Sequence, residues 1–272
     1  MRPPHPLVLI RGGGDLATGV AARLHRSGFD VVVIEIEKPL AVRRLVALAE
    51  AVYAGEVEIE DFRGRRIENV ELVKPTLEEG VIPVLVDPMA ESRHQLEPVV
   101  MVDGRMRKTP PEIGMEAARL VIGLGPGFTA GRDCHAVVET NRGHYMGRVY
   151  WEGSAEPDTN IPESVANYDL DRVLRSPRSG IFEEKKMLGS IVRKGEVIAV
   201  VNWIPLQAPF PGALRGLLHS GLEVEEGTKV GDLDPRGETS YCYQISDKSL
   251  AVGGGVLEAI LSRHEIRTLL GT

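Results

Sequence analysis

A buried strand, a glycine-rich turn, a helix and a second strand occupy the first 36 residues. The apolar run Leu7-Val8-Leu9-Ile10 predicts the first strand, and Gly12-Gly13-Gly14 follows it at once. Apolar residues then recur at helical spacing until Gly28, and Val31 to Ile36 predicts the next strand. Since these elements fit within about 30 residues, they form a βαβ unit, which restricts this part of the chain to folds with parallel strands.

Short apolar segments recur downstream at 84–86, 99–102 and 120–123, and a helix is predicted over 40–52. Strands that alternate with helices favour an α/β fold: a Rossmann-like, doubly wound, mostly parallel sheet. We place this nucleotide-binding domain at residues 1–140. Residues 141–172 have few apolar runs, and we predict a connecting segment with possible site residues there.

An internal repeat occupies residues 173–237. At an offset of 32 residues, Pro177 aligns with Pro209, Gly180 with Gly212, and four further glycine or apolar positions also match. Two copies of such a hairpin-rich unit predict a small all-β barrel sandwich, which resembles the biotinyl and lipoyl carrier fold. No lysine stands between Gly195 and Ala208, so a covalent carrier role is not expected. Residues 238–272 predict a C-terminal helical segment, opened by Gly253-Gly254-Gly255 or packed closely through these glycines.

The first turn fits a dinucleotide-binding fingerprint. Its glycines would allow a pyrophosphate to reach the start of the helix, and an acid at the end of the second strand would accept a ribose hydroxyl. Asp15 places a negative charge beside the phosphate position, and Arg43 suggests a 2′-phosphate or another anion, so a vacated pocket is the alternative. The candidate cofactor-binding residues in this region are Gly12, Gly14, Asp15, Ala17, Glu35, Glu37 and Arg43.

A second glycine cluster, Gly123, Gly125 and Gly127, follows the strand predicted at 120–123 and should face the same crevice. Cys134 and His135 come soon after it as candidate catalytic residues, because a thiol near positive charge can ionise more easily. A buried, inert cysteine is the alternative. The polar segment from Glu139 to Glu156 lacks the spacing of a metal site, so no metal is expected.

Composition narrows the function classes. The 39 acidic and 32 basic residues give a net charge of −7, which offers no surface for nucleic acid or for an anionic membrane. Two cysteines and a first apolar run of four residues predict a cytoplasmic protein without a signal peptide or membrane span.

Several motifs are similar to those of one family. They are Gly12 to Gly19, Glu35 to Arg44, Val121 to His144, Trp151 to Pro157, Gly231 to Arg236 and Ile245 to Lys248. Over nearly its whole length the chain resembles the accessory proteins of selenium-dependent molybdenum hydroxylases, of the YqeB type. The resemblance implies a partner, either the molybdenum hydroxylase or its maturation proteins, and a pterin-dinucleotide molybdenum cofactor. It assigns no catalytic role to any residue.

Three functions follow from these observations. The first is an accessory protein that binds a dinucleotide-type ligand, NAD(P) or molybdenum-pterin dinucleotide, and relays cofactor or chalcogen through Cys134. The second is an NAD(P)-dependent oxidoreductase with an appended β-domain, although no Tyr-x-x-x-Lys pair stands near a nicotinamide position. The third is a non-catalytic chaperone of the hydroxylase. The sequence does not decide whether the chain is an enzyme or forms a homo-oligomer.

Overall fold

The computed structural model describes residues 5–107, 111–157 and 172–270, which divide into two units. The first unit contains residues 5–39, 48–157 and 245–270, and the second contains 40–47 and 172–244. The bounds thus differ from the predicted domains: residues 40–47, predicted in the first domain, belong to the second unit, and residues 245–270 belong to the first unit. Part of the predicted connecting segment, 158–171, lies outside the described residues.

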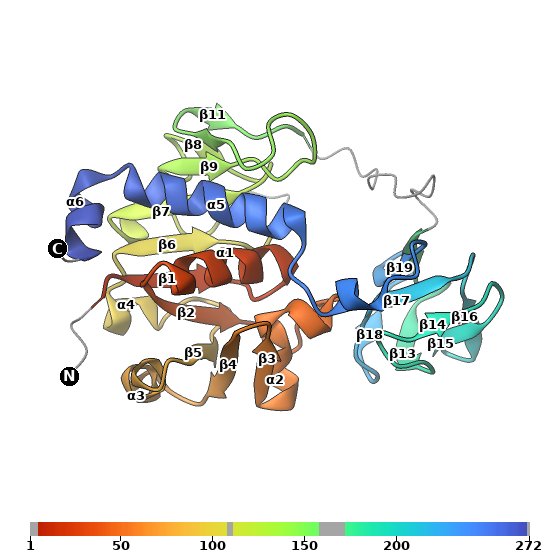
Figure 1. Cartoon of the computed structure of the whole chain (residues 1–272). Helices are drawn as coiled ribbons and strands as arrows, with labels where there is room; N and C mark the ends of the chain where they lie inside the picture. Colours follow the sequence, from red (N-terminus) through yellow and green to blue (C-terminus); the bar gives the residue numbers. More distant parts are fainter. Residues whose placement is uncertain (1–4, 108–110, 158–171, 271–272) are drawn as a thin grey trace. The chain divides into compact units, whose positions relative to one another are not determined.

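Nine strands form the main sheet of the first unit (Figure 1). In spatial order they are β10 (Val149–Tyr150), β9 (Ala136–Val138), β7 (Leu120–Leu124), β6 (Val100–Asp103), β1 (Leu7–Arg11), β2 (Asp30–Glu35), β5 (Ile82–Val86), β4 (Phe62–Ile67) and β3 (Glu56–Ile59). The seven strands from β9 to β4 run parallel, and the outermost strand on each side pairs antiparallel. The predicted α/β class with a mostly parallel sheet is thus confirmed.

The chain reverses its direction of travel across the sheet at β1. From β1 it moves to β2 and on to the edge strand β3, comes back through β4 and β5, and then crosses to β6 on the opposite side of β1. Because parallel strands share one carboxyl edge, the residues after β1 and β6 lie next to each other at this reversal. Ligands of open α/β sheets bind at such points, so this edge is where a site is expected.

Helices cover both faces of the sheet. Val33 lies against the turn that opens α1 (Asp15–Arg26), whereas Val32 belongs to a core shared with α3 (Val73–Glu78) and α4 (Arg93–Leu96). Neighbouring residues of a strand point to opposite faces, so this alternation assigns the helices to two layers. The shorter helical elements are α2 (Ala51–Ala54), α6 (His264–Arg267) and the 3₁₀ turns at Arg44–Val46, Leu48–Glu50, Val70–Leu72, Met115–Ala117, Thr239–Cys242 and Thr268–Leu270.

The C-terminal helix α5 (Asp247–Leu261) packs on α1, and Figure 1 shows the two side by side. A β-carbon on Gly19 would lie 2.4 Å from the Ser249 carbonyl oxygen, and one on Gly253 would lie 2.5 Å from the Gly19 oxygen. Glycine is required here because the two backbones touch. The expectation that residues 253–255 open the helix was wrong: Ser246 caps it by accepting from the Ser249 amide, and the glycines lie inside it.

The second unit contains two four-stranded antiparallel sheets. One has the order β12 (Val173–Arg175), β19 (Lys229–Asp234), β17 (Gly212–Leu217) and β14 (Ile191–Val192), and the other β16 (Ile204–Gln207), β15 (Val197–Val201), β13 (Gly180–Glu184) and β18 (Glu223–Val224). Strands β13, β14 and β15 begin 32 residues before β17, β18 and β19, so the repeat found in the sequence is confirmed. The copies also exchange strands, since β13 pairs with β18 while β17 pairs with β14.

The helix predicted over 40–52 is broken in the structure. Val42 and Arg44 belong to the second unit, where the Val42 carbonyl accepts from the Leu217 amide and the Arg44 Nε donates to the Leu217 carbonyl at 2.8 Å. Regular helix is confined to α2, after two 3₁₀ turns. Tertiary hydrogen bonds to β17 therefore override the local helical pattern.

Candidate functional site

The turn between β1 and α1 is built from three glycines with different roles. Gly12 has a φ of +95°, which an L-residue rarely adopts. A β-carbon on Gly13 would lie 2.7 Å from the Ala49 amide nitrogen, and the Gly13 carbonyl accepts from that amide at 2.8 Å. Backbone conformation explains Gly12, and close packing explains Gly13.

Neither backbone conformation nor close packing requires glycine at position 14. Its φ of −70° and ψ of −177° suit any residue, and a β-carbon would meet no atom within 4 Å in the part of the chain that the structure describes. The space over Gly14, at the start of α1, is open. Ala17 sits one turn further along, and its small side chain lets α1 approach Gly104 after β6, where an added β-carbon would lie 2.9 Å away. In the fingerprint, the first glycine allows a tight turn, the second leaves room for a ligand, and the third position allows close helix packing. Gly12, Gly14 and Ala17 have these three properties in this order.

Glu35 closes the turn from the end of β2. Its carboxylate accepts from the Gly13 amide at 2.7 Å through Oε2 and from the Ile36 amide at 2.8 Å through Oε1. Burial raises the pKa of this carboxyl, and the two amide bonds act in the opposite direction. Each carboxylate oxygen can accept a second hydrogen bond, so Glu35 is able to hold ribose hydroxyls while it orders the turn. Glu37, two residues beyond the strand, is exposed.

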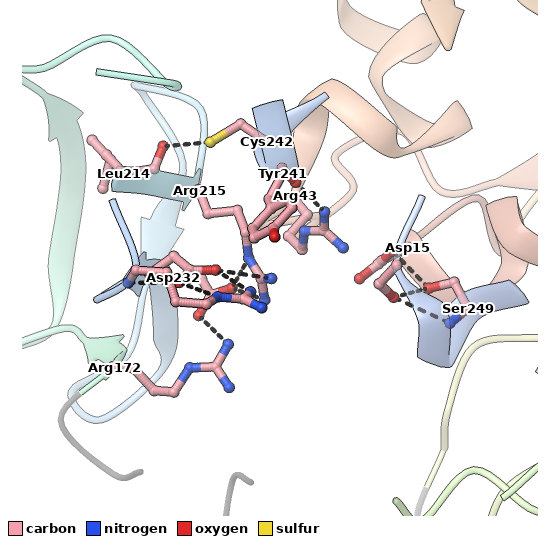
Figure 2. Close-up of polar contacts among 12 residues, drawn as sticks. Asp15, Arg43, Arg172, Leu214, Arg215, Asp232, Tyr241, Cys242 and Ser249 are labelled. Atoms are coloured by element: carbon pink, nitrogen blue, oxygen red, sulfur yellow. Dashed lines mark hydrogen bonds and ion pairs between the residues drawn. The ribbon is translucent and has the colours of Figure 1, made fainter. Parts of the chain in front are cut away.

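Asp15 is the first residue of α1, and its carboxylate accepts from the Ser249 hydroxyl at 2.8 Å (Figure 2). This contact ties the start of α1 to the start of α5, within the first unit. The negative charge at the helix N-terminus interacts favourably with the helix dipole. The structure therefore gives Asp15 a positioning role, with its side chain already bonded to α5.

A charged network that sequence reasoning missed lies beside the turn, at the ends of β1 and β6. Arg11 is 3% exposed, donates to the Pro88 carbonyl at 2.8 Å and pairs with Glu112 at 3.2 Å. Burial lowers the pKa of Arg11. Arg105 pairs with Asp103 at 2.6 Å and with Glu112 at 3.0 Å, and its side chain packs over Gly12.

Arg105 links this network to the turn: its Cγ would lie 3.2 Å from a β-carbon on Gly12, and its positive charge acts to lower the pKa of the Glu35 carboxyl. Arg11 and Asp103 could have been found from the sequence, since each directly follows an apolar strand residue at what becomes the carboxyl edge. Their partnership required the β1–β6 pairing, in which Arg11 lies opposite Asp103.

Arg43, the last of the fingerprint candidates, forms hydrogen bonds within the other unit. It belongs to the second unit, where its Nη2 donates to the carbonyl oxygens of Tyr241 at 3.1 Å and of Gln244 at 3.0 Å (Figure 2). Its side chain is buried. These bonds give Arg43 a structural role within the second unit, in place of the anion-binding role that the sequence suggested.

The second glycine cluster lies at the carboxyl end of β7, and packing explains the first two of its glycines. A β-carbon on Gly123 would collide with the Phe128 ring at 2.3 Å, and one on Gly125, at φ +77°, would meet the Thr140 hydroxyl at 2.7 Å. Gly127 lies in the turn that follows. This loop leads into β8 (Thr129–Ala130), which pairs with β11 (Gly153–Ser154), and so it opens no helix that could bind an anion.

Cys134 is fully buried in the core beneath the sheet, with Phe128 and Val137 in the same cluster. Its Sγ donates to the Ala136 carbonyl at 3.2 Å. Burial raises the pKa of the thiol to about 12. The expectation that nearby positive charge makes it reactive was wrong, because Arg132 is paired with Asp133 at 2.8 Å and the thiol is removed from water.

His135 is bonded to the neighbouring strand. Its Nδ1 accepts from the Val121 amide at 2.9 Å, and its own amide donates to the Val121 carbonyl at 2.9 Å. Burial, together with the positive charge of Arg263, lowers the pKa of the imidazole. Nδ1 is therefore occupied by a structural hydrogen bond, and the ring points to β7 rather than to the Cys134 thiol.

Glu139 and its neighbours also form hydrogen bonds within the fold. The buried Glu139 carboxylate accepts from the amides of Asn141 and Glu156, both at 2.7 Å, and thereby joins two loops. Among the described residues, no group of three or more potential ligands could hold a metal ion. Within the same residues, no helix has the length and apolar character needed to span a bilayer.

The second unit has its own buried ion-pair network (Figure 2). Arg215 on β17 pairs with Asp232 on β19 at 2.7 Å and with Asp234 at 3.4 Å, and Arg172 reaches Asp232 at 3.4 Å. Arg236, whose side chain is exposed, extends the network to the surface by pairing with Asp234 at 2.6 Å. The Arg215 pairs hold β17 and β19 together. The buried Asp232 and Asp234 carboxylates would be strongly disfavoured without these partners.

The architecture and the turn define the class of protein: an α/β protein with a mostly parallel nine-stranded sheet, small antiparallel sheets and a glycine turn at the carboxyl edge. No family model matches the chain. It is a homologue of the Escherichia coli (strain K12) "Uncharacterized protein YqeB", with 46% identity over 266 residues, which cover 96% of this chain and 49% of YqeB. The chain thus spans about half the length of this relative.

Solved structures resemble the chain only remotely. An aspartoacylase family protein from Mesorhizobium loti is 12% identical, with 85% of each chain covered and a TM-score of 0.27. A succinylglutamate desuccinylase/aspartoacylase from Rhodobacter sphaeroides is 13% identical, with 85% of this chain and 86% of that one covered and a TM-score of 0.25. Likenesses of this size carry no functional information.

Proposed function

We propose that the chain is a cytoplasmic accessory protein of a molybdenum hydroxylase and that it binds a dinucleotide-type ligand at the Gly12–Gly14 turn. The open space over Gly14 carries the binding proposal, because neither backbone conformation nor packing requires glycine there. A pyrophosphate could approach the first amides of α1 at this point. In this proposal the first unit is a Rossmann-like, doubly wound domain, and the second is a barrel similar to biotinyl and lipoyl carriers.

The charges around the turn favour a ligand with a free ribose 2′-hydroxyl. The Glu35 carboxylate is fixed on the Gly13 amide and would repel a 2′-phosphate, while Arg43 is bonded within the other unit. NAD and a molybdenum-pterin dinucleotide both meet this requirement, and NADP does not. Arg105, which packs over Gly12, would face the pyrophosphate in place of its present carboxylate partners.

The role in hydroxylase maturation rests on the family resemblance of the sequence motifs. Relay of sulfur or selenium through Cys134 is left out of the proposal, because the thiol is buried with a pKa raised to about 12. A bound pterin dinucleotide would supply the molybdenum chemistry, and this chain would supply the helix N-terminus and the Glu35 carboxylate that hold it.

Thermal unfolding tests the binding site. Wild type is compared with Gly14→Ala and with Gly254→Ala, a control whose added β-carbon also meets no described atom within 4 Å. The probes are NAD, NADP, CTP, CDP and molybdenum-pterin dinucleotide. A ligand at about 100 times its Kd stabilises by about 2.7 kcal/mol. We expect a rise in melting temperature with a 2′-hydroxyl dinucleotide that is lost in Gly14→Ala alone.

Other outcomes separate the alternatives. Stabilisation by NAD but not by the pterin dinucleotide would favour an oxidoreductase, and equal shifts in wild type and Gly14→Ala would place the ligand elsewhere. No shift with any probe would refute the binding proposal and favour a chaperone that grips its partner without a small molecule. The accessory role is tested separately, by activation of purified apo-hydroxylase with and without the chain.

A further inference from the structure

The hairpin between β15 and β16 ends in two residues with left-handed backbone. Val201 pairs with Ile204, so Asn202 and Trp203 form a two-residue turn, with φ of +42° and +71°. Two positive φ values are the mark of a type I′ turn, in which glycine is preferred at the second position. A bulky aromatic residue is unusual there because its β-carbon crowds the backbone. The turn itself therefore gives no reason for Trp203.

Packing gives no reason either. The Trp203 side chain is 91% exposed, and among the described residues no aromatic or cationic side chain stacks on its ring. The tip is nevertheless held in place: the Asn202 Oδ1 accepts from the Ile181 amide at 3.3 Å, and its Nδ2 donates to the Ser179 carbonyl at 3.4 Å. An exposed indole is thus presented from an ordered support, which limits the conformational entropy lost on binding.

The segments that contact the tip carry an exposed apolar residue and three acidic ones, with exposed Arg178, next to Ser179, as a positive charge among them. Ile181 is 44% exposed and lies opposite Glu223 on β18. Glu225 and Glu226 follow in the adjacent turn, where the Glu226 amide donates to the Ser179 hydroxyl at 3.0 Å. All three glutamates are exposed, and within the described residues none of them forms an ion pair.

We infer that the β15–β16 tip docks a partner protein whose surface has an apolar pocket for the Trp203 ring, bordered by lysine or arginine. Tryptophan is enriched among residues that dominate binding energy, and a charged border of opposite sign fixes orientation and speeds association. An anionic membrane does not fit this surface, because it would repel the three carboxylates. The inference is independent of the dinucleotide proposal, since it concerns the second unit only.

The decisive variant is Trp203→Gly. It removes the indole and puts the preferred residue at the second turn position, so the melting temperature should be unchanged or higher. Met187→Ala is the matched control, because Met187 is 81% exposed in the same unit but lies in the loop between β13 and β14. Loss of binding in Trp203→Gly alone cannot then be attributed to misfolding or to general loss of exposed apolar surface.

The partner is identified and measured in two steps. A photoreactive phenylalanine analogue in place of Ile181, in the full chain in its native cells, should crosslink one protein through a segment that contains Lys or Arg. This crosslink should disappear with Trp203→Gly. With that protein purified, its Kd for the full chain should rise about tenfold or more in Trp203→Gly. It should also rise in Glu223→Lys and with added salt, and stay unchanged in Met187→Ala.

Four results would overturn the inference. The first is that no crosslink depends on Trp203, and the second is that the captured protein is another copy of this chain. The third is that affinity is insensitive to both Glu223→Lys and salt. The fourth is that the chain co-sediments with phosphatidylcholine vesicles in a Trp203-dependent way, which would indicate insertion of the indole into a lipid surface.

Discussion

The reactivity of Cys134 offers a quantitative test of whether its thiol is buried and un-ionised. The perturbation is alkylation of the native protein with iodoacetamide at pH 8, where the reacting species is the thiolate. A thiol at the reference pKa of 9.0 would be about 10% ionised at this pH, and one at about 12 would be about 0.01% ionised. Ionisation alone therefore slows the reaction by about a thousandfold.

Burial adds to this effect. The Cys134 side chain is 0% exposed and its Sγ is bonded to the Ala136 carbonyl, so the reagent reaches it only after local or global opening. We expect Cys134 to stay unlabelled over hours in buffer and to react within minutes in guanidinium chloride. Peptide mass spectrometry measures it separately from Cys242, which is also buried with a raised pKa and should behave in the same way.

Rapid labelling of Cys134 in the native protein, at a rate near that in denaturant, would refute this reasoning. It would mean that the thiol is accessible and ionised, and would reopen its role as a sulfur or selenium acceptor. A matched test uses Cys134→Ala in a hydroxylase activation assay, where the buried assignment predicts full activation provided that the variant remains folded.

Two further predictions concern stability. Gly254→Ala should raise the free energy of unfolding by about 0.5 to 1 kcal/mol, since its added β-carbon meets no described atom within 4 Å and alanine favours a helix interior. Gly253→Ala should lower the free energy of unfolding by about 1 to 3 kcal/mol, because its β-carbon would lie 2.5 Å from the Gly19 carbonyl oxygen. Urea unfolding measures both, and the reverse order would contradict the α1–α5 contact. Glu35 binds protons more tightly when folded, because burial raises its pKa, so its contribution to stability should fall as pH rises from 4.5 through the folded pKa. The stability of wild type relative to Glu35→Gln should therefore decrease across this range, and a parallel pair of pH profiles would show that Glu35 is not shifted.

Local pattern predicted the features that depend on short segments. The segment from Leu7 to Gly28 predicted the strand, turn and helix, because a continuous apolar run, a glycine cluster and helical spacing each act over a few neighbouring residues. The 32-residue repeat predicted the paired strands of the second unit for the same reason. The spacing of the glycines in the first turn predicted a site, but only the packing of Gly13 against Ala49 distinguished the structural glycines from Gly14.

Contacts between distant segments decided the rest. The sequence suggested that Arg43 binds an anion at the dinucleotide turn. In the structure Arg43 belongs to the other unit and donates to the Tyr241 and Gln244 carbonyls. The sequence placed Cys134 near a charged loop, and the sheet buried the thiol in the core. Arg11 and Asp103, 92 positions apart, became neighbours only when β6 paired with β1.

The sequence by itself determined the α/β class, the glycine turn and the internal repeat, since these follow from local periodicity and backbone freedom. The tertiary structure alone decided which residues remain available to a ligand or a partner. Burial and hydrogen bonding depend on segments that meet in space. Contacts of this kind bury or bond the Arg43 guanidinium, the Cys134 thiol and the His135 Nδ1 within the fold, whereas the space over Gly14 is open and the Trp203 side chain is exposed.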